Sequence, residues 1–270
     1  MKPDSRYALG IDIGGTTTKI AVVSETGNVL KFWSIPTDLR GGVDAFIDRV
    51  AAGAGECDGV GVAVAGFVND EQTRMVYNPN LPELENYPLK AALEARLGKP
   101  VTLDADSNSA CFGEYRVGVG AGSRRFLCLV LGTGAGGGMI VDGRIVRLAH
   151  GGLGDMGHVI VAPDGPMCSA GCRGCLEAMV QAEAEPLGRY VGIALATHAA
   201  ILFPERIAIG GGRAEAGDAL VKPAEEAFRA ASGPFYRRDV TIHKARLGWQ
   251  ASVVGAALQA ISRPAHAPAP

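Results

Sequence analysis

The sequence lacks a long apolar run and a strong excess of either charge. No stretch approaches the roughly 18 uncharged apolar residues that a membrane-spanning helix needs, and the N-terminal MKPDSRYALGIDIGG has no apolar segment of signal-peptide length. The formal net charge is -2, so no broad basic surface for nucleic acid is indicated. We therefore expect a cytoplasmic protein that has neither a membrane nor a nucleic acid as partner.

Aromatic residues are scarce, at 6%, whereas glycine is abundant, at 38 of 270 residues. This is roughly double the usual share of glycine. The glycines cluster in short runs instead of spreading through a linker, which indicates backbone that approaches a ligand closely. The remaining composition, 47% hydrophobic and 20% charged, is that of a globular protein with one large or two moderate domains.

The six cysteines fall into two groups. Three are isolated and read as small core hydrophobes: Cys57, Cys111 and Cys128. The other three crowd together at Cys168, Cys172 and Cys175. In a chain of this size without a signal peptide, this crowding favours a metal over disulfides.

Patterns of apolar residues divide the chain into two α/β halves at a glycine-rich break, Gly118–Gly122. In the first half they predict strands at 8–13, 19–23, 29–34, 60–65 and 101–103, and helices at 43–52, 89–97 and 107–117. In the second half they predict strands at 126–131, 138–141, 144–148, 206–209 and 240–243, and helices at 187–203, 219–231 and 252–261. The tail, 263–270, is rich in proline and alanine, and we expect it to be disordered.

A first glycine-rich loop carries several groups that suit a phosphate. Gly14 and Gly15 let backbone N–H groups point at phosphate oxygens with no Cβ in the way. Thr16 adds a hydroxyl and Lys19 a positive charge, and Asp12 offers a carboxylate to hydrated Mg²⁺. The sequence favours phosphate binding here over the alternative, a plain glycine hairpin turn.

A second loop, Gly132-Thr133-Gly134, echoes the first in the other half of the chain. Each loop ends an apolar strand and leads into another strand, so two such loops would face each other across a cleft that holds several phosphates. The spacing fits neither a Walker A loop nor a GxGxxG turn that opens a helix. The pattern therefore argues against P-loop and Rossmann folds.

Several further motifs follow in a fixed order along the chain. They are DIGGTTTK at 12–19, NPN at 78–80, DSNSACFGE at 106–114, LGTGAGGG at 131–138, GDMGH at 154–158, the cysteine cluster ending in CLE at 175–177, and GGG at 210–212. In their joint order the chain resembles the ROK family of bacterial sugar kinases and repressors, and within it the zinc-containing glucokinase-like members. The resemblance runs from about Leu9 to Gly255. No helix-turn-helix segment precedes Asp12, so we expect a kinase and not a repressor.

The resemblance implies an α/β, two-lobed, actin-like ATPase fold (a duplicated ribonuclease H-like fold) with an inter-lobe cleft. The first lobe would be 1–117, with the C-terminal helix at about 248–262 packing back on it. The second lobe would be 118–247. ATP would place its phosphates on both glycine loops and its adenosine near Gly210, Gly211 and Gly212. Kinases of this family often dimerise, so we expect a homodimer.

The resemblance also assigns the sugar site. Asp106 would be the base that takes the proton of the attacking sugar hydroxyl; a helix N-cap is the alternative role, and Asp104 is a rival base. The sugar ring would be held by Asn80, Asp155, His158 and Glu177. For Asn80 the alternative is a simple turn residue.

A His-Cys₃ zinc site is expected from the ligands His158, Cys168, Cys172 and Cys175. The alternative is a reduced cysteine-rich loop without metal. A structural zinc would brace the loop that delivers Glu177 and His158 to the sugar.

The chain departs from the family pattern at four places. Ala105 stands where family kinases usually carry an asparagine that contacts the sugar, and Asp155 replaces the usual glutamate. Ala170 stands at the usual second cysteine, with Cys172 two residues later. The stretch from Glu177 to Gly210 is much shorter than in the family, which puts a complete adenosine pocket in doubt.

We therefore expect ATP- and Mg²⁺-dependent phosphorylation of a hexose substrate, glucose to glucose 6-phosphate. Two alternatives stay open. One is a kinase for an N-acetylated hexosamine or fructose, because of the changes at Ala105 and Asp155. The other is a non-catalytic sugar-binding regulatory protein, because of the shortened second lobe.

Overall fold

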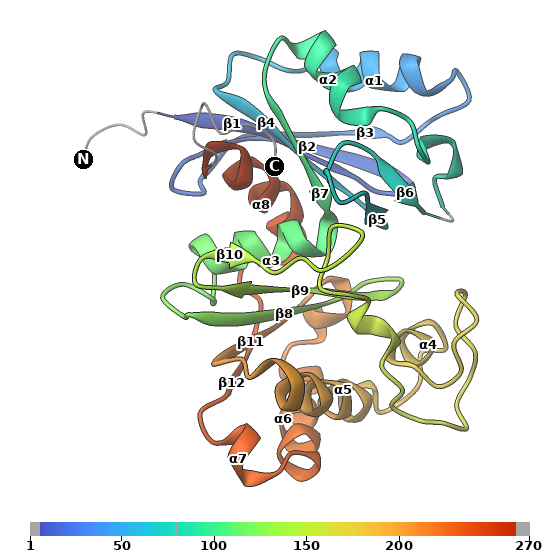
Figure 1. Ribbon diagram of the computed structural model, residues 1–270, viewed down its shortest axis with the longest axis vertical. Coiled ribbons are helices and arrows are strands. Elements are labelled where there is room, and N and C mark those ends of the chain that lie inside the picture. Colours follow the sequence, from blue (N-terminus) through green and yellow to red (C-terminus); the bar gives the residue numbers. More distant parts are fainter. Residues whose placement is uncertain (1–5, 79, 263–270) are drawn as a thin grey trace. The chain divides into compact units, whose positions relative to one another are not determined.

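The computed structural model describes residues 6–78 and 80–262, which form two compact units (Figure 1). The first unit takes the described residues up to Val117, together with Arg147–Gly154 and the chain from Gln250. The second takes Gly118–Val146 and Asp155–Trp249. The tail for which disorder is expected, 263–270, lies outside the described residues.

The first unit is built on a five-stranded sheet in the order β3-β2-β1-β4-β7. Three antiparallel strands come first: β1 (Tyr7–Ile13), β2 (Thr17–Ser24) and β3 (Val29–Pro36). β4 (Gly59–Val64) and β7 (Val101–Ala105) then run parallel to β1. Smaller elements of this unit are β5 (Phe67–Val68), β6 (Met75–Tyr77) and the 3-10 turn Pro82–Leu84.

Helices cover both faces of this sheet. On one face α1 (Val43–Ala52) and α2 (Leu89–Leu97) share an apolar core with the strands. On the other face α8 (Ala251–Ser262) lies directly on the strands, beside α3 (Asp106–Val117). This close approach needs Gly10 of β1, because a Cβ there would lie 2.1 Å from the Val253 carbonyl oxygen. The C-terminal helix therefore completes the unit that the N-terminal strands begin.

The second unit repeats this plan with a sheet in the order β10-β9-β8-β11-β12. Its strands are β8 (Arg125–Leu131), β9 (Ala135–Val141), β10 (Arg144–Ile145), β11 (Arg206–Gly210) and β12 (Thr241–Lys244). Its helices are α4 (Leu176–Gln181), α5 (Leu187–Leu202), α6 (Asp218–Ala231) and α7 (Pro234–Arg237). Its 3-10 turns are Met156–His158, Gly212–Ala216 and Gly248–Gln250, of which the last crosses into the first unit.

The structure corrects two predictions about the middle of the chain. The strand predicted at 144–148 ends at Ile145. Residues Arg147–Gly154, placed in the second lobe from the sequence, group with the first unit. Arg147, the first residue of this segment, pairs through its guanidinium with Asp104 in the first sheet, which is consistent with both differences. The elements α4, α7, β5 and β6 were not predicted, because each is too short to show a periodic pattern.

No helix in the described part of the chain combines the length and the hydrophobicity that crossing a membrane requires.

Candidate active site

Two acidic side chains lie at the carboxyl-terminal edge of the first sheet. The register of the parallel strands places Asp12 of β1 beside Ala63 of β4, and Ala63 beside Asp104 of β7. Asp106 follows two residues later, as the first residue of α3. Because parallel strands end at the same edge of a sheet, Asp12 and Asp106 become neighbours although they are far apart in sequence.

Burial and like charge act together on these two carboxyl groups. The pKa of Asp106 is raised to about 7, mainly by burial and next by the negative charge of Asp12, while Lys19 opposes the shift. Burial also raises the pKa of Asp12, against the effect of Lys19, whose Nζ lies 3.2 Å from Asp12 Oδ2. Asp106 Oδ1 accepts a 2.6 Å hydrogen bond from the Ser107 N–H. Burial and the charge of Asp12 together favour the protonated form of Asp106 relative to an ordinary aspartate.

Asp104, the rival base, has a different environment. It is fully buried, and Arg147 donates to it through Nη2 at 2.6 Å. The side-chain amides of Asn108 and Gln259 donate to it at 2.9 and 3.1 Å. Arg147 and Asn108 also donate to the Gly151 carbonyl oxygen, at 3.0 and 2.9 Å. Asp104 thus anchors the segment Arg147–Gly154, a role that the sequence analysis missed because no motif includes Arg147.

Each glycine loop joins two antiparallel strands of its own unit. Gly14-Gly15-Thr16 joins the antiparallel strands β1 and β2, and the Gly14 N–H donates to the Thr17 carbonyl oxygen at 3.3 Å. Gly132-Thr133-Gly134 joins β8 and β9, and the Gly132 N–H donates to the Gly134 carbonyl oxygen at 2.9 Å. Both are hairpin turns whose tips are exposed to solvent. The geometry agrees with the plain-turn interpretation and leaves the loop tips accessible to a phosphate.

The glycine triplet Gly210–Gly212 lies against the strand that leads into the second loop. Gly211 has φ +84°, and a Cβ on it would lie 2.3 Å from the Leu131 carbonyl oxygen. The positive φ and the close approach to Leu131 each require glycine at Gly211. Leu131 is followed directly by Gly132, so the triplet and the second loop are adjacent within the second unit.

Asn80 lies at the surface of the first unit. Its N–H donates to Asn78 Oδ1 at 2.8 Å, and the Asn78 side chain in turn donates to the Ala65 carbonyl oxygen at 2.9 Å. Pro79, between them, lies outside the described residues. The hydrogen bonds of buried Asn78 therefore fix the position of the Asn80 backbone.

In the second unit the predicted sugar ligands Asp155, His158 and Glu177 come together. His158 Nε2 lies 3.2 Å from Asp155 Oδ2 and 3.9 Å from Glu177 Oε1. Glu177 Oε2 accepts a 3.2 Å hydrogen bond from the Ala135 N–H, which directly follows the second glycine loop. The pKa of Asp155 is raised, mainly by burial, with His158 opposing and Glu177 adding to the shift. These polar groups converge beside Gly134.

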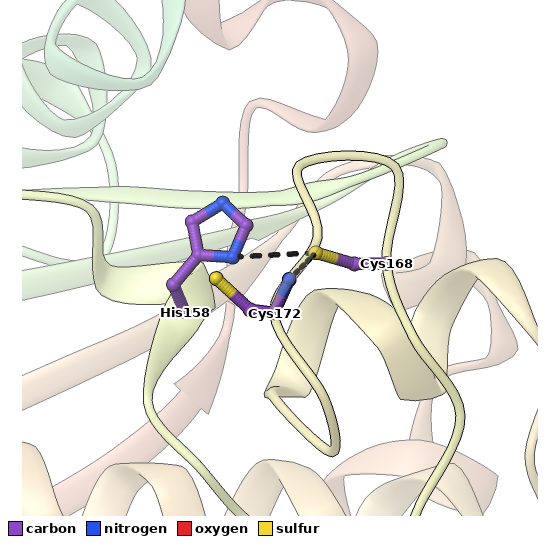
Figure 2. Close-up of side chains that lie close together, drawn as sticks. All are labelled: His158, Cys168 and Cys172. Atoms are coloured by element: carbon purple, nitrogen blue, oxygen red, sulfur yellow. Dashed lines mark hydrogen bonds between the residues drawn. The ribbon is translucent and has the colours of Figure 1, made fainter.

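Three of the four predicted metal ligands are also close together. The donor atoms of His158, Cys168 and Cys172 all lie within 4.8 Å of one another. Figure 2 shows these three side chains close together. His158 Nδ1 is 3.7 Å from Cys168 Sγ. Cys175 lies outside this group of atoms, and its Sγ caps α4 by accepting a 3.3 Å hydrogen bond from the Ala178 N–H. Burial raises the pKa of the Cys175 thiol to about 11.

This donor set fits zinc in two respects. Tetrahedral zinc with one sulfur and one nitrogen ligand separates these two atoms by about 3.6 Å, close to the distance between His158 and Cys168. Zinc-bound histidines usually give their second ring nitrogen to a carboxylate. With Nδ1 toward the cysteines, His158 Nε2 faces Asp155 and Glu177. His158 can therefore belong to the metal site and to the polar cluster at the same time.

Comparison with known proteins identifies the class of fold and then the family. The structure is similar to that of a ROK family glucokinase from Streptomyces griseus in complex with glucose and AMPPNP, with a TM-score of 0.81 and 28% identity, covering 95% of this chain and 100% of that chain. The fold is therefore the two-lobed, actin-like ATPase fold, as predicted. The ROK family model matches residues 8–185, and the chain belongs to the ROK family.

Two relatives bear on the substrate. A glucokinase from Streptomyces coelicolor is 31% identical over 306 residues, covering 92% of this chain and 96% of that protein. An N-acetylmannosamine kinase from Vibrio cholerae is 34% identical over 180 residues, covering 65% of this chain and 62% of that protein. The first alignment is longer than the 270 residues of this chain, so that glucokinase contains residues that this chain lacks.

The anchor of Arg147 on Asp104 can be tested by its effect on stability. Arg147→Met should lower the free energy of unfolding by about 3–5 kcal/mol, because it leaves a buried carboxylate without its counter-charge. Arg124→Met is the matched control, since Arg124 pairs with Asp142 at the surface, where an ion pair contributes about 1 kcal/mol or less. Adding Asp104→Asn to Arg147→Met should recover part of the loss. Denaturant unfolding measures all four proteins, and equal stability of Arg147→Met and Arg124→Met would contradict the anchor.

Proposed function

We propose that this protein transfers the γ-phosphoryl group of ATP to glucose and forms glucose 6-phosphate. The observation that carries the proposal is the grouping of Asp106 with Asp12 and Lys19 at one edge of the first sheet, where burial and the charge of Asp12 raise the pKa of Asp106 to about 7. Membership of the ROK family supports the reaction class. The S. coelicolor glucokinase and the glucose complex of the S. griseus enzyme support the choice of sugar.

Asp106 takes the proton of the sugar hydroxyl as its oxygen attacks the γ-phosphorus. Asp12 would hold hydrated Mg²⁺, which would supply positive charge to the transferred phosphoryl group. Lys19 lies next to Asp12 and adds a further positive charge. Cations beside Asp12 offset its negative charge. The repulsion between the carboxylates of Asp12 and unprotonated Asp106, which raises the pKa of Asp106, is then weaker during the reaction.

The remaining predicted residues bind the two substrates. The N–H groups and hydroxyls of the two glycine loops hold the phosphates: Gly14, Gly15, Thr16, Gly132, Thr133 and Gly134. The nucleoside lies near Gly210, Gly211 and Gly212, of which Gly212 leaves open space where a Cβ would stand and so allows a close approach to the backbone. Asn80, Asp155, His158 and Glu177 hydrogen-bond the sugar hydroxyls, for which amide, carboxylate and imidazole groups are suitable partners.

Other sugars stay as alternatives because of two residues. Ala105 has no amide with which to hold a sugar hydroxyl, and Asp155 is shorter than a glutamate by one methylene. The V. cholerae relative keeps an N-acetylated hexosamine open, and fructose is the third candidate. A non-catalytic role is disfavoured by the presence of Asp12, Lys19 and Asp106 together.

The proposal is tested by ADP release from ATP with glucose, N-acetylmannosamine, N-acetylglucosamine and fructose. We expect glucose to give the highest kcat/KM. Asp106→Asn should lower kcat at least about 10²-fold with little change in sugar binding, because the amide cannot accept the proton. Asp58→Asn, a carboxylate at the start of the first sheet that accepts from the Tyr7 N–H, is the control and should keep its activity. Near-normal turnover of Asp106→Asn would remove this residue from the mechanism.

We also propose a structural zinc ion, held by His158, Cys168 and Cys172 with Cys175 as the fourth ligand. The purified protein should contain about one zinc per chain, and Cys172→Ser should lose it. Cys57→Ser, which changes a cysteine of the first core, is the control and should keep the metal. Metal analysis decides, and full zinc occupancy in Cys172→Ser would show that Cys172 is not a ligand.

The family resemblance further supports a homodimer in the cytoplasm. Light scattering on the purified protein tests whether it is a homodimer. Cell fractionation tests whether it is in the cytoplasm.

A further inference from the structure

The 3-10 turn Met156–His158 joins two of the proposed sugar ligands, Asp155 and His158. Asp155 stands at the start of this turn and closes it. Its side chain accepts a 3.3 Å hydrogen bond from the Gly157 N–H, and its carbonyl oxygen accepts a 3.2 Å hydrogen bond from the His158 N–H. Hydrogen bonds inside a turn do not fix where that turn lies in the protein. The place of this turn in the second unit therefore depends on what packs around it.

Strand β9 contacts the turn directly. A Cβ on Gly157 would lie 1.9 Å from the Ala135 carbonyl oxygen, and a Cβ on Gly137 would lie 2.7 Å from Met156 Sδ. The absence of a Cβ at both glycines lets the turn lie against the strand. Met156 is buried in this contact. The packing on β9 therefore sets how closely the turn approaches the second sheet.

Helix α5 binds the same turn through a buried histidine. His198 Nε2 lies 3.2 Å from the Met156 carbonyl oxygen, and His198 is 4% exposed. A carbonyl oxygen can only accept a hydrogen bond, so His198 Nε2 carries the proton and donates it. Burial lowers the pKa of His198, with the bond to Met156 opposing, so the ring is neutral at neutral pH and has one N–H. This single N–H is committed to the backbone of the turn.

Packing alone does not explain a histidine at this position. Its buried neighbours along α5 are the apolar residues Ala194, Leu195 and Ala199. An imidazole buried among apolar side chains costs free energy that a leucine would not cost, unless the ring has a hydrogen-bond partner. The partner of His198 is the backbone between two proposed sugar ligands. The polar ring is thus explained by the turn that it binds.

We propose that His198 is a positioning residue of the sugar site: its hydrogen bond fixes the Met156 backbone and thereby the place at which His158 meets the sugar. The inference rests on the proposed function, in which Asp155 and His158 bind the sugar. Glu177 is held separately, by the backbone N–H that follows the second glycine loop. Loss of the His198 hydrogen bond should therefore weaken sugar binding without abolishing it.

The first test compares steady-state kinetics. His198→Leu has a similar volume but no N–H, and it should raise the KM for glucose about tenfold, with kcat and the KM for ATP changed less than about twofold. His198→Gln should restore most of the affinity, because its amide N–H can replace that of Nε2. His243→Leu, which removes an exposed histidine of β12, is the control and should behave as wild type. An unchanged KM for glucose in His198→Leu, or equal losses in kcat and in both KM values, would contradict the positioning role.

The second test needs neither sugar nor turnover. Hydrogen exchange followed by mass spectrometry should show that a peptide spanning 155–160 exchanges about tenfold faster in His198→Leu, whereas peptides from α6 exchange at the wild-type rate. His198→Gln should return the turn to slow exchange. Unchanged exchange in the turn would overturn the proposal. Equal acceleration throughout the second unit would also count against it, because the substitution would then act on the stability of the whole unit.

The outcomes separate this inference from the proposed function. Faster exchange confined to the turn, in a protein that phosphorylates none of the sugars tested, would count against the kinase and support His198 as the residue that holds the turn. An active glucose kinase whose KM for glucose is indifferent to His198→Leu would count against His198 alone. Where His198→Leu does not fold, His198→Asn takes its place in both tests, because its shorter side chain cannot bring the amide to the position of Nε2.

Discussion

The placement of two carboxylates at one edge of a parallel sheet is the constraint on which the rest of the structure depends. Asp12 ends up near Asp106 because β1, β4 and β7 run in the same direction. Burial raises the pKa of both groups, and the negative charge of Asp12 further disfavours ionisation of Asp106. A cation beside Asp12 relieves this repulsion, and Lys19 already supplies one. This arrangement suits the proposed binding of Mg²⁺ at Asp12 and the proposed role of Asp106 as a base.

Close packing of backbone against backbone in the first unit keeps Asp12 and Asp106 in place. α8 can lie on the first sheet because Gly10 presents no Cβ to the Val253 carbonyl oxygen. Asp104 contributes from within the same sheet, since it binds Arg147 and, through Arg147, the Gly151 backbone. The segment Arg147–Gly154 leads directly into Asp155 and the turn that carries His158. The ion pair between Arg147 and Asp104 therefore stabilises the segment Arg147–Gly154. This segment is followed directly by Asp155, a residue of the candidate sugar site.

Much of the fold and part of the site follow from the sequence. Strands and long helices show clear apolar periodicity, and the glycine loops stand between strands, so their places in the chain were predictable. The ion pair of Arg147 with Asp104 was not, because it joins residues that only the three-dimensional structure brings together. The bond of Cys175 to the N-terminus of α4 was missed for a similar reason, since this helix is too short to show a pattern.

The pH dependence of kcat/KM for glucose tests the central claim, that the environment of Asp106 makes it a base at neutral pH. A base acts only when it is unprotonated, so kcat/KM should fall about tenfold per pH unit below the pKa of Asp106 in the free enzyme. Burial and the charge of Asp12 place this pKa at about 7, against an ordinary value of 3.8. We therefore predict an acid limb with an apparent pKa of about 7. A kcat/KM that stays constant on acidification until the pH nears 3.8 would contradict the account.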